Sequence, residues 1–582
     1  MSEFSPVLLS VIQNGLSHIV DEMDLATERS AFNPAMSESR DRASGIYSVD
    51  GGAVIAQGET GLPIFIGVMK FAVAAAVEAF PELAPGDIVA LNDPYLGGTH
   101  LMDTKLVKPF FYRGKLFCYL ANTGHWVDVG GSVPGGFNSK ATEIFQEGLR
   151  IPPIRLFREG KLDRDLLELI LTNMRLPEER MGDLQAQLAG INVGERRLTE
   201  FLDKYGADTV SAYIGELSRR SEKQMRSAIE RLPDGRYSFE AKIDSDGIVW
   251  KPINLALDLT IDGDELVFDF SRSDAPVAGP LNCSFPATAA AVYLSIKHIF
   301  PDIPINDGCF RPVRIVAPET TFLNARYPKA VSGSSAEVSM RICDVVFGCL
   351  AQAAPDLVPA ASFGTVSNFT IGGFDPVRGK RYIMFRFSGG GYGGHPISDG
   401  LTNGCGAISM ARTSSIEVQE QLYPVRFEYY RMKQGSAGAG KNRGGFGTEY
   451  LVRLTAGEGV GSVMGDRGVF GPYGLHDGHE GGKAEVEFHR DGERFVPRHI
   501  TKEEVIPLKA GDAVRIASPG GGGWGNPLER DVEAVRKDVE RELLGADEAR
   551  TIYGVVLDRN EQGRLVVDAD ATSAERAGSD AR

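Results

Sequence analysis

The hydrophobic period of the chain changes along its length, and this change restricts the folds that it can adopt. Apolar residues recur at spacings of three and four in residues 5–23 and again in residues 163–232, which is typical of helices that bury one face. Residues 255–270 instead alternate apolar with polar around a turn at Asp262 and Gly263, which predicts an antiparallel hairpin. A chain with both periods in separate blocks is expected to form a large, multi-layer, mixed α+β fold.

We expect three regions along the 582 residues. Residues 1–235 are predicted to be an N-terminal α/β region that bears the metal and contains the helical block, residues 236–526 a β-rich region, and residues 527–582 a C-terminal helix and tail. The first boundary rests on residues 233–235, Pro-Asp-Gly, where the helical period stops. Strand and turn signals continue to about residue 516, so the helical block lies in the N-terminal half and the C-terminal half is β-rich.

Local signals place several single elements. Residues 62–80 have the pattern of a helix that ends before Pro81. Residues 106–111 and 115–122 are predicted strands, joined as a hairpin about Arg113 and Gly114. The polar residues 568–582 are expected to be a frayed tail.

The charge of the chain excludes some classes of partner. With 62 Lys and Arg residues against 78 Asp and Glu, the net charge is −16, so nucleic acid and anionic membrane surfaces would repel it. The most apolar stretch is interrupted by Pro63, Lys70 and Glu78, and the first residues lack a basic, apolar leader, so neither a membrane span nor an export signal is expected. The six cysteines form no Cys-x-x-Cys pair, which favours the cytoplasm over a disulfide framework.

Glycine is the outlier in composition, with 69 residues, and three of its runs resemble phosphate-binding loops. Residues 435–441 spell the start of a P-loop, but Asn442 stands where Ser or Thr should contact magnesium. Residues 389–394 and 520–525 have the dinucleotide-binding spacing, yet a proline follows each instead of a helix. We interpret the three runs as turns or bulges with close backbone approaches, and the chain is not expected to bind ATP by itself.

Two loops that follow predicted strands hold histidines among carboxylates. Residues 92–103 contain Asp93, His100 and Asp103, and residues 122–128 contain His125 and Asp128. If the strands bring these loops together, two imidazoles and carboxylates could surround a divalent cation. Such a donor set suits zinc, manganese or ferrous iron, with zinc narrowly preferred, and does not suit calcium or magnesium. The alternative is that these are ordinary turn residues, with His125 and Asp128 forming a simple hydrogen-bonded pair.

Five strings spread over the chain resemble the hydantoinase B/oxoprolinase family. They lie at residues 92–103, 122–131, 143–153, 520–531 and 552–557. Because the set covers nearly the whole chain, it is more specific than any single motif. Members of this family include the smaller subunits of ATP-dependent hydantoinases and of caprolactamase, the second half of 5-oxoprolinase, and subunits of ketone carboxylases.

The resemblance implies a partner and a metal. The partner is a hydantoinase A-type subunit with an actin-like fold, which binds ATP and magnesium and phosphorylates the substrate oxygen, in an (αβ)2 heterotetramer. The metal is expected in this chain, at the positions that match the family: Asp41, His100, Asp103 and His125. Asp93 and Asp128 are then candidates to orient an imidazole by accepting its free N–H.

These implications define one expected function and two alternatives. The expected function is an ATP-dependent hydrolase of small cyclic amides of the lactam, hydantoin or 5-oxoproline type, in which a metal-bound water opens a ring activated by phosphorylation. The first alternative is an ATP-dependent ketone carboxylase, which would incorporate bicarbonate carbon. The second is a non-catalytic scaffold for an ATPase subunit, with structural histidines.

Overall fold

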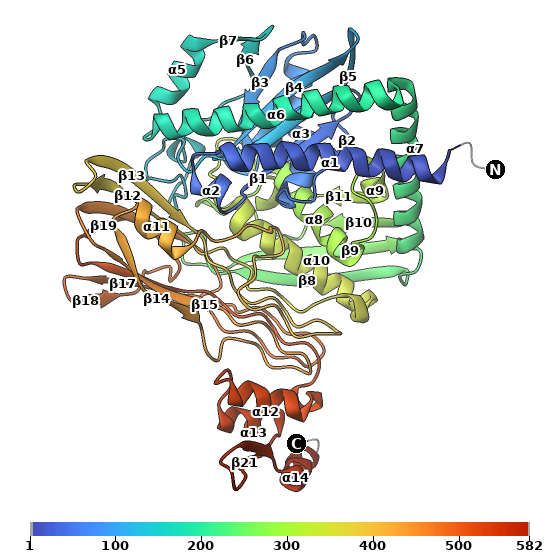
Figure 1. The fold of residues 1–582 in the computed structure, drawn as a ribbon. Coiled ribbons are helices and arrows are strands. Elements are labelled where there is room, and N and C mark those ends of the chain that lie inside the picture. Colours follow the sequence, from blue (N-terminus) through green and yellow to red (C-terminus); the bar gives the residue numbers. More distant parts are fainter. Residues whose placement is uncertain (1–3, 580–582) are drawn as a thin grey trace.

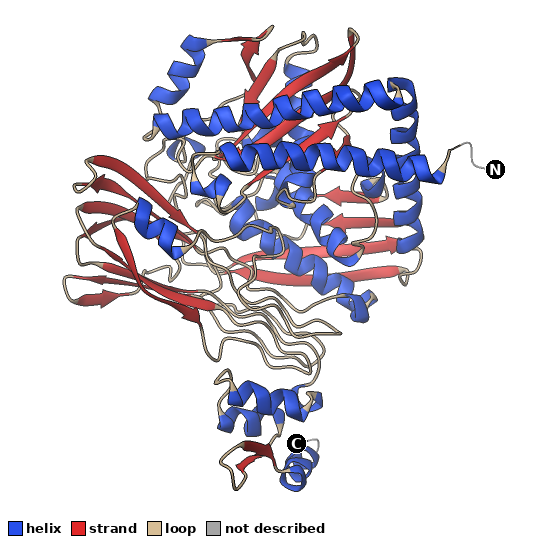
Figure 2. Cartoon of the chain, in the orientation of Figure 1, coloured by secondary structure: helices blue, strands red, loops and turns tan. Residues whose placement is uncertain are grey.

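The computed structural model describes residues 4–579 and confirms a mixed α+β fold with several sheets (Figures 1 and 2). Neighbouring strands of the first sheet are all antiparallel. Its strands, in spatial order, are β2 (Val54–Gln57), β1 (Arg42–Tyr47), β5 (Lys115–His125), β4 (Asp103–Tyr112), β3 (Ile88–Leu91), β6 (Ile154–Arg158) and β7 (Lys161–Leu162). The predicted hairpin about Arg113 and Gly114 is β4 and β5.

Helices cover both faces of this sheet, so every residue of β1 is buried. The long helices α1 (Pro6–Ser30) and α6 (Pro177–Tyr205) lie side by side and pack on β1 and β5 (Figure 1). On the other face, α3 (Ile64–Ala79) packs between the sheet and α8 (Phe285–Ile299). The remaining helices of this part are α2 (Pro34–Ser37), α4 (Pro94–Gly97), α5 (Arg164–Thr172), α7 (Ala207–Ile229) and α9 (Asp307–Phe310).

A further layer follows α8, which packs on α10 (Ser339–Ala353), and α10 packs on a second sheet. The strands of this sheet, in spatial order, are β11 (Val313–Val316), β10 (Glu265–Asp269), β9 (Ile253–Asp262) and β8 (Gly235–Ile243). The predicted hairpin of residues 255–270 is β9 and β10. The strand and turn signals missed α8 and α10, because both helices are buried on nearly every side and show no single apolar stripe.

One hydrophobic core extends across the predicted boundary near residue 235. The change of element is where the pattern predicts it, since α7 ends at Ile229 and β8 begins at Gly235. Ile229 and Leu255 nevertheless belong to the same apolar cluster, which reaches from α1 to the end of β16. The division into three regions therefore stays a prediction, while the core of the first two-thirds of the chain is continuous.

The second half of the chain adds a β-sandwich, on the left in Figure 2. The two sheets share one apolar core, to which β12 contributes Phe369 and β20 contributes Val514. The strands of one sheet are β13 (Lys380–Arg386), β12 (Asn368–Asp375), β16 (Glu458–Met464) and β19 (Lys502–Lys509). Those of the other are β14 (Val425–Met432), β15 (Thr448–Leu454), β20 (Ala513–Ala517), β17 (Glu485–Arg490) and β18 (Glu493–Phe495), and α11 (Ile416–Leu422) packs on β14.

The three glycine runs lie together in a bundle of extended chains below the sandwich (Figure 1). Residues 520–525 form its centre and bond both other runs: Gly394 N–H donates to Gly522 O at 2.8 Å, and Gly438 N–H donates to Gly521 O at 2.8 Å. The N–H groups of Gly521, Gly522 and Gly523 donate to three different segments, at Gly445, Ala361 and His479. Successive N–H groups of a β-strand would alternate between two directions only, so this packing is threefold, as in polyproline II-type helices.

Close packing explains why this bundle needs glycine. A Cβ atom on Gly521 would lie 1.8 Å from the carbonyl oxygen of Tyr392, and one on Gly523 would lie 1.9 Å from that of Ala439. The interpretation of the runs as turns or bulges is therefore wrong for this central segment, whereas the expected close backbone approach is confirmed. Many backbone N–H groups of the bundle donate to other segments of the same chain, so these groups are not free to bind a phosphate.

A small C-terminal unit follows the bundle and has an apolar cluster of its own (Figure 1). Its elements are α12 (Val532–Glu540), α13 (Ala546–Tyr553), β21 (Leu557–Arg559), β22 (Leu565–Val567) and α14 (Ala569–Ser579). The frayed tail expected from residue 568 is wrong as far as Ser579, since Thr572 Oγ1 accepts from Val556 N–H at 3.0 Å and fixes α14. Residues 580–582 lie outside the described part.

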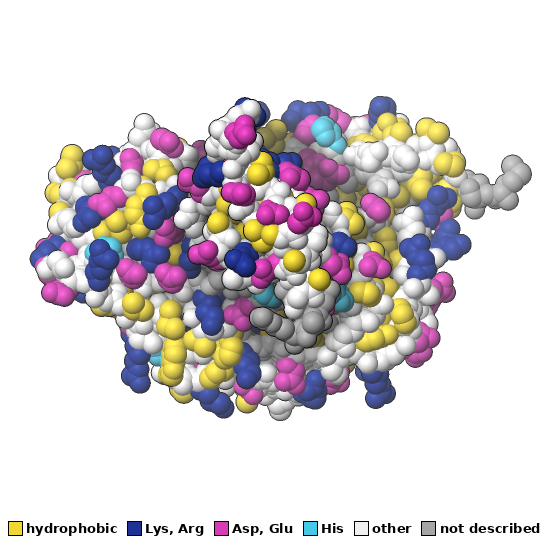
Figure 3. Space-filling model, turned by 90° about the horizontal axis from the view of Figure 1, so that it is seen from below, with side chains coloured by type: hydrophobic (Ala, Val, Ile, Leu, Met, Phe, Trp, Pro, Cys, Tyr) yellow, Lys and Arg dark blue, Asp and Glu magenta, His cyan; other side chains and the backbone are white. Residues whose placement is uncertain are grey.

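Seen from the end that carries this unit, Lys and Arg side chains are interspersed with Asp and Glu (Figure 3). Within residues 4–579, no helix combines the length and the apolar character needed to cross a bilayer.

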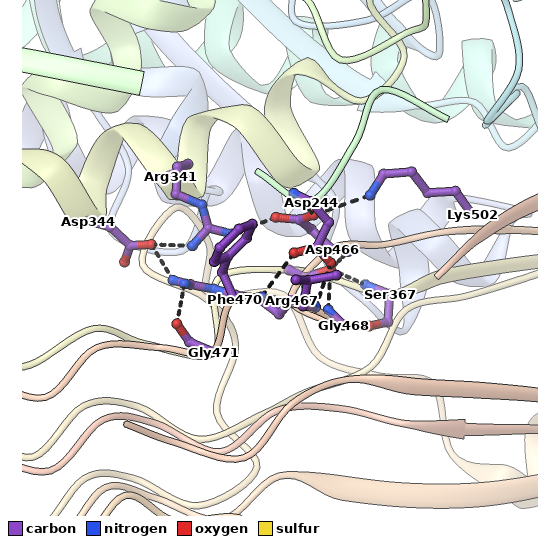
Figure 4. Close-up of polar contacts among 12 residues, drawn as sticks. Asp244, Arg341, Asp344, Ser367, Asp466, Arg467, Gly468, Phe470, Gly471 and Lys502 are labelled. Carbon is purple, nitrogen blue, oxygen red and sulfur yellow. Dashed lines mark hydrogen bonds and ion pairs between the residues drawn. The ribbon is translucent and has the colours of Figure 1, made fainter. Parts of the chain in front are cut away.

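A buried network of charges joins the sandwich to the layered part of the fold (Figure 4). Asp466, which follows β16, accepts from Arg341 Nη2 on α10 at 2.7 Å and from Lys502 Nζ of β19 at 3.2 Å. Asp344 on α10 pairs with both Arg341 and Arg467. Each charge has an opposite partner, so the network can be buried without an isolated ion.

We expect Gly521→Ala to destabilise the protein, because the added methyl group has no room beside Tyr392 O. The loss in free energy of unfolding should be about 1–3 kcal/mol or more, measured by denaturant titration. The control is Gly215→Ala on α7, where a Cβ meets no atom within 4 Å; this change should stabilise the protein by about 0.5–1 kcal/mol. Equal effects of the two changes would contradict the close packing of the bundle.

Asp466→Asn should cost about 3–5 kcal/mol, because it leaves the charges of Arg341 and Lys502 buried without their shared partner. Asp491→Asn is the matched control, since Asp491 pairs with Lys509 at the exposed surface, and it should leave the unfolding midpoint nearly unchanged. A midpoint for Asp466→Asn equal to that of the control would show that the network does not hold the two parts together.

Candidate metal centre

The β4–β5 hairpin places Asp103 directly opposite His125. Asp103 is the first residue of β4, His125 is the last residue of β5, and the two are paired in the antiparallel ladder. Residues opposite each other in such a ladder project their side chains from the same face. His125 Nδ1 accordingly lies 3.3 Å from Asp103 Oδ1.

Asp41 and His100 reach the same place from two loops. Asp41 precedes β1, which pairs with β5, and its carbonyl oxygen accepts from His125 N–H at 3.0 Å. Its carboxylate Oδ2 is 3.7 Å from His125 Nδ1. His100 lies between α4 and β4, and its Nδ1 is 3.4 Å from Asp103 Oδ2. The four residues that match the family motif are therefore brought together.

The donor atoms have the spacing that one cation requires. One ligand atom from each of His100, Asp103 and His125 lies within 4.8 Å of the others, and Asp41 joins them beside His125. His100 Nδ1 and His125 Nε2 are buried without a hydrogen-bond partner among the described residues. An unpaired buried polar atom is costly, so these two nitrogens fit a site completed by a cation.

Burial and neighbouring charges favour the metal-binding forms of His100 and Asp103, whereas the pKa values of Asp41 and His125 are both raised. Burial lowers the pKa of His100 to about 4, which keeps its imidazole neutral at pH 7. Burial alone would raise the pKa of Asp103, but its interactions with His100, His125 and Lys105 outweigh burial and hold this pKa below its usual range. Burial raises the pKa of Asp41 to about 7 against the opposing effect of His125.

Two side chains that the sequence did not indicate hold Asp103 in place. Thr99 Oγ1 donates to Asp103 Oδ2, and Lys105 Nζ donates to the carbonyl oxygen of Asp103 at 2.9 Å. Thr99 and Lys105 were not singled out in the sequence, although both lie within four residues of Asp103.

Asp93 and Asp128 do not contact His100 or His125 in the structure. Asp93 accepts from Tyr95 N–H at 3.0 Å and so begins α4, and it also pairs with Arg150. Asp128 accepts from the N–H groups of Gly130 and Gly135 and pairs with Arg175. Both carboxylates organise loops instead of orienting an imidazole, because backbone N–H groups of their own turns lie closer.

A cavity of about 60 Å³ opens beside the four residues, and its other walls come from both halves of the chain. The rings of His125, Phe137 and Phe385 pack against one another, with the centroid of His125 5.9 Å from that of Phe137 and 5.3 Å from that of Phe385. Ser335, in a short π-helix (Ser334–Val338) that precedes α10, lines the same space. Asn368 at the start of β12 also lines it, and its Nδ2 has no hydrogen-bond partner among the described residues. No local sequence signal marks these wall residues, because they reach the site only through long-range packing.

The family model for Hydantoinase B/oxoprolinase matches residues 5–527. The chain belongs to this family. It is 33% identical to the caprolactamase subunit beta of Pseudomonas jessenii over 99% of this chain and 100% of that protein. It is 28% identical to 5-oxoprolinase 1 of Arabidopsis thaliana over 90% of this chain and 42% of that much longer protein.

Solved structures agree with the family assignment. The crystal structure of the ATP-dependent caprolactamase from Pseudomonas jessenii matches 99% of this chain and 100% of that chain, with a TM-score of 0.88 and 30% identity. The nucleotide-free structure of an ATP-dependent acetone carboxylase matches 100% of this chain and 83% of that chain, with a TM-score of 0.91. At 20% identity, the second match shows a shared fold alone.

We expect the purified chain to hold one divalent ion, measured by elemental analysis, and His100→Ala to lose it because one of its nitrogen donors is gone. Thr99→Val, which removes the bond to Asp103, should lower metal affinity by about 10–100-fold. His18→Ala is the control, since the His18 side chain is 74% exposed on α1. A folded His100→Ala protein with a full complement of metal would contradict the site.

Proposed function

We propose that this chain is the metal-bearing subunit of an ATP-dependent cyclic amide hydrolase, active with a separate ATP-binding subunit. The observation that carries this proposal is that two imidazoles and two carboxylates, from two loops and the ends of β4 and β5, lie together beside a cavity. Full-length similarity to a caprolactamase subunit beta supports the substrate class.

Asp41, His100, Asp103 and His125 would hold the metal, with zinc preferred over manganese or iron because the donors are two nitrogens and two oxygens. A bound metal of this kind lowers the pKa of water and polarises an oxygen of the substrate. The chain itself supplies the surroundings: Phe137 and Phe385 exclude bulk water, and the free amide N–H of Asn368 can orient the oxygen of a ring.

The ATP-binding step is assigned to a partner. The three glycine runs that resemble nucleotide loops are committed to the glycine bundle, so they do not supply a phosphate site in the described residues. A hydantoinase A-type subunit in an (αβ)2 assembly in the cytoplasm is the partner that the family implies. Phosphorylation of the amide oxygen would overcome the resonance that stabilises a lactam and provide a leaving group.

The alternative of a ketone carboxylase is favoured only by the fold shared with acetone carboxylase. That chain extends beyond this one, which covers 83% of it, whereas this chain and the caprolactamase subunit beta match end to end. Hydrolysis is therefore the preferred reaction, and bicarbonate use is the distinguishing test.

Co-expression with a hydantoinase A-type subunit provides the test. We expect the purified complex to open a lactam, hydantoin or 5-oxoproline ring only with ATP, to release phosphate in step with ring opening, and to incorporate no labelled bicarbonate. His125→Ala should abolish ring opening, because it removes both a metal donor and the partner of Asp103, while His18→Ala should not. ATP consumption that yields a carboxylated product would replace the proposal with the carboxylase.

A further inference from the structure

A second cavity shares a wall with the metal cavity. It has a volume of about 450 Å³, and Phe387, Cys405 and Ala411 line both spaces. The segment that forms the wall is tied to the loop of Asp41, because Arg412 N–H donates to the carbonyl oxygen of Ser39 at 3.0 Å. Unlike the metal cavity, the second one is lined by arginines, Arg386 and Arg412, and we call it the arginine cavity.

Arg386 is an exception among the buried arginines of the described residues. The other five, each at most 3% exposed, all pair with a carboxylate: Arg42 with Asp24, Arg180 with Asp183, Arg341 and Arg467 with Asp344, and Arg530 with Asp538. Arg386 is 2% exposed and has no ion pair within residues 4–579. Its Nη1 donates to the neutral Gln419 Oε1 at 2.9 Å, and its Nε has no partner.

Aromatic rings do not replace the missing anion. The guanidinium of Arg386 lies 4.7 to 5.2 Å from the ring centroids of Phe427, Tyr430 and Tyr450. Such contacts stabilise a cation by less than the burial of an uncompensated charge costs. A buried guanidinium that lines a cavity and has no carboxylate partner of its own is therefore suited to an anionic ligand.

The rest of the lining adds a second positive charge. Arg412 is exposed at the cavity and makes no ion pair within the described residues, and the only carboxylate in the lining is the exposed Glu417. Tyr430 contributes a hydroxyl, held by Asn403 Oδ1 at 3.1 Å. Two arginines match the charge of about −2 that a phosphoryl group carries, whereas a carboxylate would need only one.

We infer that the arginine cavity binds a phosphoryl oxyanion through Arg386 and Arg412, next to the metal cavity. This inference deepens the proposed function, on which the identity of the ligand rests: the phosphoryl group would belong either to the activated substrate or to the phosphate released from it.

Inorganic phosphate is the probe, and its binding to the full-length chain is measured by titration calorimetry at constant ionic strength, with chloride and acetate as competing anions. We expect phosphate to bind and Arg412→Ala to weaken binding at least about tenfold, since one of two charges is lost. Arg426→Ala is the matched control, because Arg426 is exposed on β14, also lacks an ion pair in the described residues, and lies outside the cavity lining. It should bind phosphate as the unaltered chain does.

Arg386→Gln should abolish phosphate binding, and Arg386→Lys, which keeps the charge but not the two-pronged donor, should restore part of it. Near-ultraviolet circular dichroism confirms that each variant is folded. Absence of phosphate binding, equal binding by Arg412→Ala and Arg426→Ala, or a preference for acetate over phosphate would overturn the inference.

A second experiment distinguishes activated substrate from released phosphate as the source of the phosphoryl group. It also tests the arginine cavity separately from the proposed function. In the complex with the ATP-binding subunit, Arg412→Ala should raise KM if the site holds the activated substrate, and should relieve inhibition by added phosphate if it holds the product. Phosphate binding without ring opening would refute the proposed function and leave the site standing. Ring opening without phosphate binding would refute the site alone.

Discussion

The register of one hairpin determines where the chemistry of this protein can occur. Asp103 and His125 face each other only because β4 and β5 shift by one residue at a bulge between Phe110 and Phe111. Without the bulge, the register beyond the turn would pair Asp103 with Gly124, and the imidazole would project from the opposite face of the sheet. The pairing of β1 with β5 then places Asp41 beside the same histidine.

The second half of the chain completes the site from a distance. The charge network around Asp466 joins α10 to the sandwich, and the glycine bundle fixes the segments that run below it. These contacts fix the sandwich on the layered part of the fold, and Asn368 and Phe385 of its strands line the metal cavity. The arginine cavity lies on the other side of the shared wall, and its lining includes Arg386 and Arg412.

Sequence reasoning was strongest where local rules decide the outcome. The helical block and the hairpin about Arg113 and Gly114 follow from periodicity and turn chemistry, and the structure contains both. It failed for α8 and α10, whose burial on nearly every side removes the helical period, and for the glycine runs, whose packing depends on segments distant in the sequence. No sequence pattern marks Lys105, which donates to the carbonyl oxygen of Asp103, or Asn368, which lines the metal cavity, because only tertiary contacts give these residues a role.

The central claim is that Asp41, His100, Asp103 and His125 bind one metal ion in the intact protein. Anomalous X-ray diffraction from crystals of the chain, recorded on both sides of the absorption edges of zinc, manganese and iron, tests it most directly. The account predicts a single strong peak between the two imidazoles and Asp103, at the edge of one of these metals. A crystal of active complex in which the peak is absent, or lies away from these four side chains, would contradict it.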